Sequence, residues 1–297
     1  MEAVEYRRLC RLIDQASPHG RAAREQFSNA VIAKVYFWSN FCVRSVQWAC
    51  DPRNWPEQLR EELIGDLPSQ PTMSRRMRSL GVLQLIERMQ VMLAQALQDN
   101  AVVKAMDSKP LVVGNYSKDR QAKRGRAAGE RARGYKLHVI SCGKAFVHWT
   151  LMPMNCNDQV GAAMLLPRLR GWGYVTADNG YDANAVYQQA WQANHQLVAP
   201  PRPSNAGVRD VRRNTSQRIR SLDLCANPLG HCGLGEGFGG WLQRQREQLE
   251  RNFGNATMCG LYAPPPWVRT PHRVAAWAAA KIIQCMLRQV EIARLTV

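Results

Sequence analysis

The chain has 297 residues, 45% of them hydrophobic, which is enough for one large domain or two ordinary ones. Forty Lys and Arg against 23 Asp and Glu give a formal net charge of +17. This excess indicates a polyanionic partner, nucleic acid before anionic membrane, although a charge that serves only solubility is the alternative. No apolar run reaches the ~20 residues of a membrane span, and no signal peptide opens the chain. We therefore expect a cytoplasmic, nucleoid-associated protein without membrane contact.

Residues 1–100 are predicted to be helical throughout. Phe27–Val46 carries apolar residues at the spacing of a mostly buried helix. Asp51-Pro52 and Trp55-Pro56 follow as turn signals. We expect this region to form a domain of its own that binds DNA ends.

The segment 67–80 predicts a further helix, with Ser69 or Thr72 as its cap and Pro71 in its first turn. We expect its apolar side chains, Met73, Met77 and Leu80, to face inward. The outward face then carries Ser74, Arg75, Arg76 and Arg78. This face resembles the recognition helix of a helix-turn-helix, and the alternative is a solvated basic helix in a plain bundle.

After residue 100 the pattern changes to short apolar strands that alternate with helices. Three strands come first: Val102–Met106, which ends at Asp107, and a hairpin of Tyr135–Ser141 with Ala145–Met152. The later elements are a helix at 158–169, the strand Tyr174–Ala177, a helix at 183–193, a strand at 196–199, and helices at 241–252 and 273–295. This order predicts a mixed-sheet α/β core.

Residues 200–240 are predicted to be an irregular insertion, basic at first and Gly-rich from Gly230 to Gly240. Two arginine-rich stretches suit contacts with the phosphate backbone of DNA, and a solvated disordered loop is the alternative. The first holds Lys118, Arg120, Lys123, Arg124, Arg126, Arg131, Arg133 and Lys136. The second holds Arg202, Arg209, Arg212, Arg213, Arg218 and Arg220.

Asp107 and Asp178 each follow a short apolar strand directly. Side chains at the ends of neighbouring strands can converge at one edge of a sheet. Two carboxylates that lie close together repel, and hard divalent cations relieve the repulsion and supply phosphodiester chemistry. The alternative is that each Asp caps the next helix or turn.

A third acid is offered by the helix at 241–252, where Glu250 lies one turn after Arg246 and can share its face. A plain surface salt bridge is the alternative role for this pair. Glu247 lies on nearly the same side of the helix, and helical geometry does not exclude it.

Three blocks together resemble the signature of DDE transposases from bacterial insertion sequences. They are Asp107-Ser108, Asp178-Asn-Gly-Tyr181 and Arg246-x-x-x-Glu250, in this order and at nearly equal separations. The resemblance covers roughly residues 100–290. It implies a ribonuclease-H-like mixed sheet flanked by helices and a catalytic domain over 101–297.

The resemblance also implies the chemistry. Asp107, Asp178 and Glu250 would be the catalytic residues and would hold two Mg²⁺ ions, for which Mn²⁺ can substitute, with Asp107 bridging. Arg246 would orient Glu250 or bind DNA phosphate. The reaction would be cleavage of transposon ends and joining of the freed 3′-hydroxyl to target DNA, by a homodimer on double-stranded DNA.

One departure concerns the DNA grip. The family has a Tyr three residues before the Arg and a Lys seven after the Glu, where this chain has Gln243 and Thr257. This leaves two alternatives to a transposase: an inactive or domesticated DNA-binding protein of the same fold, and a nuclease without strand transfer.

Overall fold

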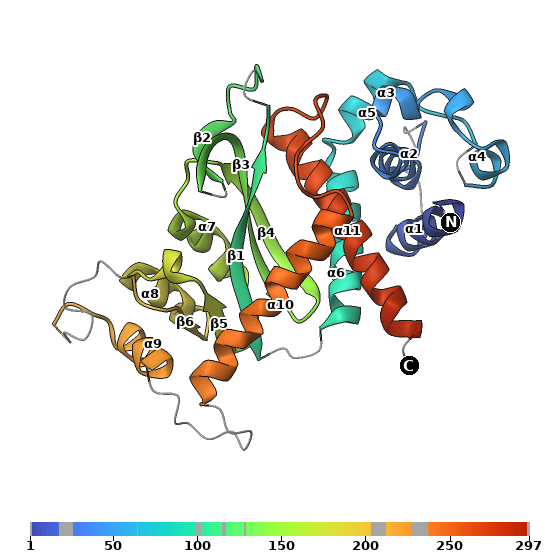
Figure 1. The fold of residues 1–297 in the computed structure, drawn as a ribbon. Coiled ribbons are helices and arrows are strands. Elements are labelled where there is room, and N and C mark those ends of the chain that lie inside the picture. The colour runs from blue at the N-terminus through green and yellow to red at the C-terminus, as the bar shows by residue number, and fades with distance from the viewer. Residues whose placement is uncertain are drawn as a thin grey trace. The chain divides into compact units, whose positions relative to one another are not determined.

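The structure is a computed structural model that describes residues 2–17, 26–63, 65–98, 102–114, 117–127, 129–202, 212–226 and 237–295 (Figure 1). The chain forms two compact units. One comprises Met1–Ala96 with Ala276–Val297, and the other comprises Leu97–Ala275. The expected functional domains, 1–100 for DNA ends and 101–297 for catalysis, stay predictions. None of the described helices has the length and apolarity to cross a membrane.

The first unit is helical, which confirms the predicted helical N-terminal region. Its helices are α1 (Glu2–Ala16), α2 (Asn29–Phe41), α3 (Val46–Ala49), η1 (Pro52–Asn54), α4 (Glu57–Leu63), α5 (Gln70–Arg76), α6 (Leu80–Leu97) and most of α11 (Pro271–Leu295). Helix α2 is buried from Ile32 to Asn40, as its nearly continuous apolar sequence requires. The Trp38 ring packs 4.8 Å from the rings of both Tyr6 and Trp55, and this aromatic cluster forms part of the core.

Helix α5 begins as predicted. The Ser69 hydroxyl accepts a hydrogen bond from the Thr72 N–H, and Met73 is fully buried. The inward placement of Leu80 was wrong: its side chain is 69% exposed. Helix α5 ends at Arg76 and Leu80 opens α6, so the helical phase does not continue across the break.

The arginines of this segment differ in their surroundings. The Arg76 guanidinium donates to the Phe27 carbonyl at 2.9 Å and to Asn29 Oδ1 at 2.7 Å. Arg76 therefore ties α5 to the start of α2. Arg75 and Arg78 are exposed, and their contact with DNA stays a prediction.

The second unit is built on one sheet, whose strands are β1 (Val103–Val112), β2 (Lys123–Ala127), β3 (Glu130–Cys142), β4 (Ala145–Pro153), β5 (Gly173–Ala177) and β6 (His195–Val198). Strand β3 is antiparallel to β1, β2 and β4, and β5 and β6 continue on the other side of β1 in parallel pairing. Antiparallel pairing among β1 to β4, followed by the two parallel strands β5 and β6, confirms the predicted mixed α/β sheet.

Helices cover both faces of this sheet. On one face, α7 (Asp158–Leu165), η2 (Leu166–Arg168) and α8 (Asn184–Gln192) pack on a core that includes Met106, Ile140 and Val175. On the other face, Leu242 of α10 (Phe238–Met258) packs on Val103 and Val198. Figure 1 shows α10, in orange, running across β1 and β5. The predicted flanking helices are therefore confirmed.

Two stretches differ from the sequence-based expectation. The first arginine-rich stretch, expected to be a cationic loop, contains β2, which pairs with the start of β3 as a hairpin. The stretch 200–240, expected to be irregular, contains α9 (Ser216–Ala226), whose Arg218, Ser221 and Leu222 are buried. Only one of these three is apolar, so helical periodicity did not reveal α9. Residues 203–211, with Arg209, and 227–236, with most of the Gly-rich run, lie outside the described residues.

Candidate active site

Asp107 and Asp178 come together at the end of one parallel ladder. The pairing of β1 with β5 ends at Met106 opposite Ala177. Asp107 and Asp178 are the next residues on these two neighbouring segments. Asp107 does not end its strand as predicted, because β1 continues to Val112 against β3. Asp178 directly follows β5. The alternation of side chains along a strand puts both on the face that α10 covers.

Each aspartate is held by the backbone that follows it. The Ser108 N–H donates to Asp107 Oδ1 at 2.7 Å. The Gly180 N–H donates to Asp178 Oδ1 at 2.9 Å, so Asp178 caps η3 (Asn179–Tyr181) as the alternative reading expected. Capping η3 uses one oxygen of Asp178, and it does not remove the carboxylate from the site.

The electrostatics show that the two carboxylates interact. Burial raises the pKa of Asp107 from its usual 3.8 to about 6, the Ser108 N–H opposes the rise, and the charge of Asp178 adds to it. Burial also raises the pKa of Asp178. The charge of Arg246 lowers the pKa of both. A cation beside this pair is therefore favoured.

Helix α10 presents Arg246 from within its buried stripe. Leu242, Leu249 and Phe253 are buried on the side of α10 that faces the sheet, and Arg246 has the helical spacing of this stripe. Asn252 fixes the helix, since its Nδ2 donates to the Gly143 carbonyl of the β3–β4 turn at 2.9 Å. An arginine in an apolar stripe is directed toward the sheet, where the two aspartates lie.

The two candidate glutamates of α10 have different partners. Arg246 Nη2 lies 3.0 Å from Glu250 Oε1, whereas Glu247 pairs with Arg251 at 3.6 Å. Glu250 thus shares the face of Arg246, but its side chain is 55% exposed. Among the residues that the structure describes, no three His, Cys, Asp or Glu side chains are close enough together to hold a metal ion. The role of Glu250 as third ligand stays a prediction.

A fourth acid that the sequence did not single out lies in the same electrostatic group. The charge of Asp158, the first residue of α7, raises the pKa of Asp107 and of Asp178. After burial, the charges of these three aspartates also raise the pKa of the buried Tyr181 hydroxyl. An Asp one residue after Asn157, the helix cap, reads as an ordinary first-turn acid, so the sequence held no signal for its position.

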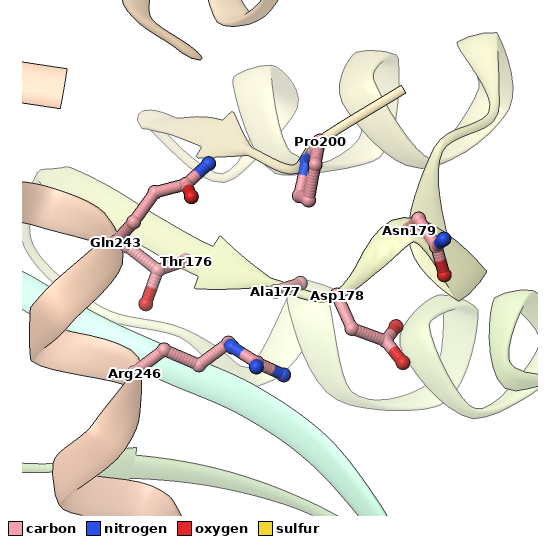
Figure 2. Close-up of a pocket in the computed structure, with 7 residues that line it drawn as sticks. All are labelled: Thr176, Ala177, Asp178, Asn179, Pro200, Gln243 and Arg246. Carbon is pink, nitrogen blue, oxygen red and sulfur yellow. The ribbon is translucent and has the colours of Figure 1, made fainter. Parts of the chain in front are cut away.

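A cavity of about 330 Å³ lies beside Asp178 (Figure 2). It is lined by Thr176, Ala177, Asp178, Asn179, Pro200, Gln243 and Arg246. Figure 2 shows the Arg246 side chain extending from α10 toward Asp178. Gln243, which stands where the family has Tyr, donates to Cys225 Sγ at 3.0 Å. Thr257, which replaces the family's Lys, donates to the Phe253 carbonyl at 2.7 Å within α10.

The segment after Asp178 is held by two arginines of the second basic stretch. Arg218 makes a bidentate ion pair with the buried Asp182, with both contacts at 2.7 Å. Arg202 donates to the carbonyls of Asn179 and Gly180. Arg218 is itself buried. It is therefore not the solvent-exposed phosphate contact that the sequence analysis expected. These two side chains hold the η3 turn.

Most of the first basic stretch is exposed. Its exposed members are Lys118, Arg120, Lys123, Arg124, Arg126 and Arg131. Arg133 is different, because it donates to the carbonyls of Ser117, Asp119 and Ala122. Lys136 lies 3.1 Å from Asp158. The structure therefore brings Lys136 to the acidic group and uses Arg133 to hold a loop.

Comparison with known proteins assigns the family. The family model described as "Transposase DDE domain" matches residues 99–258, which contain all three predicted acids. A solved structure of a piggyBac transposase in a synaptic complex with hairpin DNA is similar, with 12% sequence identity, a TM-score of 0.44, and coverage of 99% of this chain and 67% of that one. No curated protein matches the chain. The chain belongs to the transposase DDE domain family.

Proposed function

We propose that the protein is a DNA transposase that cleaves transposon ends and joins the freed 3′-hydroxyl to target DNA by metal-dependent phosphoryl transfer. The observation that carries the proposal is the convergence of Asp107 and Asp178 at the end of the β1–β5 ladder, with Arg246 directed at them. Membership of the transposase family supports the same chemistry.

The carboxylate pair fits a hard divalent cation. Both groups offer oxygen ligands, and the raised pKa of Asp107 reflects burial and like charge that a bound cation offsets. We infer that Asp107 and Asp178 hold Mg²⁺, with Mn²⁺ as a substitute, and that Glu250 joins them by leaving its ion pair with Arg246. Held by these residues, two such ions would supply activation of the attacking oxygen and stabilisation of the leaving oxygen in an in-line displacement.

The chain's own residues would place the DNA. The charge of Arg246 acts on both aspartates, and a guanidinium matches the geometry of a phosphate. The exposed hairpin of β2 and β3 supplies positive charge for the DNA backbone. Arg126 and Arg131 stand opposite each other on this hairpin. Like charges in cross-strand register repel, and a polyanion relieves that repulsion. Two transposon ends must be joined, so we infer a homodimer on double-stranded DNA.

The test uses the full chain with labelled duplexes that carry the inverted repeats flanking its gene. With Mg²⁺ the wild-type protein should nick an intact end and should join a pre-cleaved end to target DNA, while Asp107→Asn should do neither. Nicking without joining would identify a nuclease. Binding without nicking would identify an inactive DNA-binding protein. Either result would overturn the proposal.

A further inference from the structure

Asp158 accepts a hydrogen bond from Ser108, the residue that follows Asp107. Its Oδ1 accepts a hydrogen bond of 2.9 Å from the Ser108 hydroxyl. The backbone N–H of the same serine donates to Asp107 Oδ1 at 2.7 Å. Ser108 therefore connects the two carboxylates, since one of its hydrogen bonds reaches Asp107 and the other reaches Asp158.

The second oxygen of Asp158 lies near the residue that holds Asp178. A side-chain carbon added at Gly180 would lie 3.4 Å from Asp158 Oδ2 and 2.9 Å from Asp178 Oδ1. The Gly180 N–H is the donor to Asp178. The carboxylate of Asp158 thus lies between the chain that follows Asp107 and the chain that follows Asp178, although it belongs to a third element, α7.

Lys136 fixes the orientation of Asp158. Its Nζ donates to Asp158 Oδ1 at 3.1 Å and to the Cys156 carbonyl at 3.2 Å. The neighbouring His138 is fully buried, with Nδ1 3.8 Å from the same oxygen. Burial lowers the pKa of His138 to about 4, so at neutral pH the ring is uncharged and Lys136 is the cation that pairs with Asp158. This pairing orients the carboxylate toward Ser108.

We propose that Asp158 is a positioning residue that holds the two chain segments carrying Asp107 and Asp178 in register with each other. It rests on the proposed function, because the pair it positions is the proposed metal-binding pair. Asp158 acts through Ser108 and through contact with the turn at Gly180. Without it, β1 would keep its ladder to β3, but the segments that follow the two aspartates would lose their common anchor.

The location of Asp158 favours a positioning role over a role as a metal ligand. The side chains that donate hydrogen bonds to Asp158 are Ser108 of β1 and Lys136 of β3, on the face of the sheet that α7 covers. Asp107 lies on the face that α10 covers. The contribution of Asp158 to chemistry would therefore be geometric, and small displacements of catalytic groups reduce rates strongly.

The first test is amide hydrogen exchange of the full chain, which needs neither metal nor DNA. Asp158→Ala should accelerate exchange at the Ser108 and Gly180 amides by about tenfold or more, because their segments lose a charge-assisted anchor. Asp158→Asn keeps an acceptor oxygen for Ser108 and Lys136, so its exchange should stay close to that of the wild type. Asp223→Ala, at an exposed aspartate of α9, is the matched control.

The second test is the Mg²⁺-dependent cleavage rate measured beside DNA affinity. Asp158→Ala should lower kcat about 10- to 100-fold with unchanged DNA affinity, and Asp158→Asn should stay within about fivefold of wild type. Ser108→Ala, which removes only the hydroxyl, should reproduce the exchange effect at position 108 even if Asp158→Ala does not fold.

Two results would overturn the proposal. One is a wild-type rate of exchange at the Ser108 and Gly180 amides in Asp158→Ala. If that variant does not fold, a wild-type rate at the amide of position 108 in Ser108→Ala has the same meaning. The other is an Asp158→Asn protein as inactive as Asp107→Asn, which would make Asp158 a ligand. If the wild-type chain cleaves no DNA, the proposed function fails by itself, and the exchange measurement still decides whether Asp158 anchors the two segments.

Discussion

The Arg246 guanidinium lies 3.0 Å from the Glu250 carboxylate, one turn along the same helix. The same charge lowers the pKa of Asp107 and of Asp178. The charge of one arginine therefore acts on three acids, of which two directly follow the paired residues of the β1–β5 ladder and one belongs to α10. This arrangement makes Arg246 the cation that the acids share when no metal ion is bound.

Replacing Arg246 should strongly reduce the rate of DNA cleavage and leave the protein folded. Arg246→Ala should lower the Mg²⁺-dependent rate about 100-fold, because the side chain stabilises charge at the reacting phosphate and orients Glu250. Arg246→Lys should recover only part of the rate, since Lys cannot make a bidentate contact. Arg244→Ala, at an exposed arginine of the same helix, is the control. Equal losses in Arg246→Ala and Arg244→Ala would contradict a specific role.

The three predicted ligands should behave alike in activity assays. Asp107→Asn, Asp178→Asn and Glu250→Gln should each abolish metal-dependent cleavage, because each removes a charged oxygen ligand, and should leave DNA affinity nearly unchanged. Glu247→Gln should be mild, since Glu247 pairs with Arg251. Severe loss in Glu247→Gln beside an active Glu250→Gln would move the third ligand to Glu247.

The buried charge of Asp107 should lower the free energy of unfolding of the metal-free protein at pH 8 but not at pH 4. Its folded pKa of about 6 exceeds its usual 3.8, so the charged form costs stability above pH 6 and the cost disappears as pH falls below 4. The full shift corresponds to about 3 kcal/mol. Asp107→Asn should therefore raise the free energy of unfolding by up to that amount at pH 8 and by little at pH 4.

Urea unfolding in the presence of a chelator, at both pH values, measures this difference. Asp223→Asn, at an exposed aspartate, should change the free energy of unfolding little at either pH. An Asp107→Asn protein with the same gain at pH 4 as at pH 8 would show that the charge of Asp107 is not the cause.

The ion pair of Arg218 with Asp182 should be important for stability. Arg218→Met leaves the Asp182 carboxylate buried without its cation, which costs about 3–5 kcal/mol. Asp182→Asn should cost a similar amount, and the double variant should cost less than the two single changes together. Arg220→Met, at an exposed neighbour on α9, should lower the melting temperature much less. Additive losses in the double variant would contradict the pairing.

The hairpin of β2 and β3 should control how DNA affinity depends on salt. If Arg126 and Arg131 each contact a phosphate, the double change to Ala reduces the slope of log K against log salt by about 1.8. Arg133→Ala should leave the slope unchanged, because Arg133 is bonded to loop carbonyls. Arg168→Ala, at an exposed arginine outside the hairpin, is the control. An unchanged slope in the double variant would place the DNA elsewhere.

The sequence by itself determined the mixed α/β class of the fold and predicted that Asp107 and Asp178 lie close together. The apolar residues that precede Asp107 and Asp178 are local features, and the order of strands and helices follows from short-range patterns of apolar side chains. The hairpin at 135–152 was predicted for the same reason. Helix α9 and strand β2 were not predicted, because few apolar residues mark them.

Only the tertiary structure decided how the polar side chains are used. Arg218, Arg133, Arg76 and Lys136 look alike in a basic sequence, yet each is bonded to a residue that no local pattern identifies. Asp158 joins the acidic group because α7 begins beside β1 and η3, and this follows from packing of whole elements. Burial and charge act through space, so the pKa of Asp107 depends on residues that are distant in the sequence.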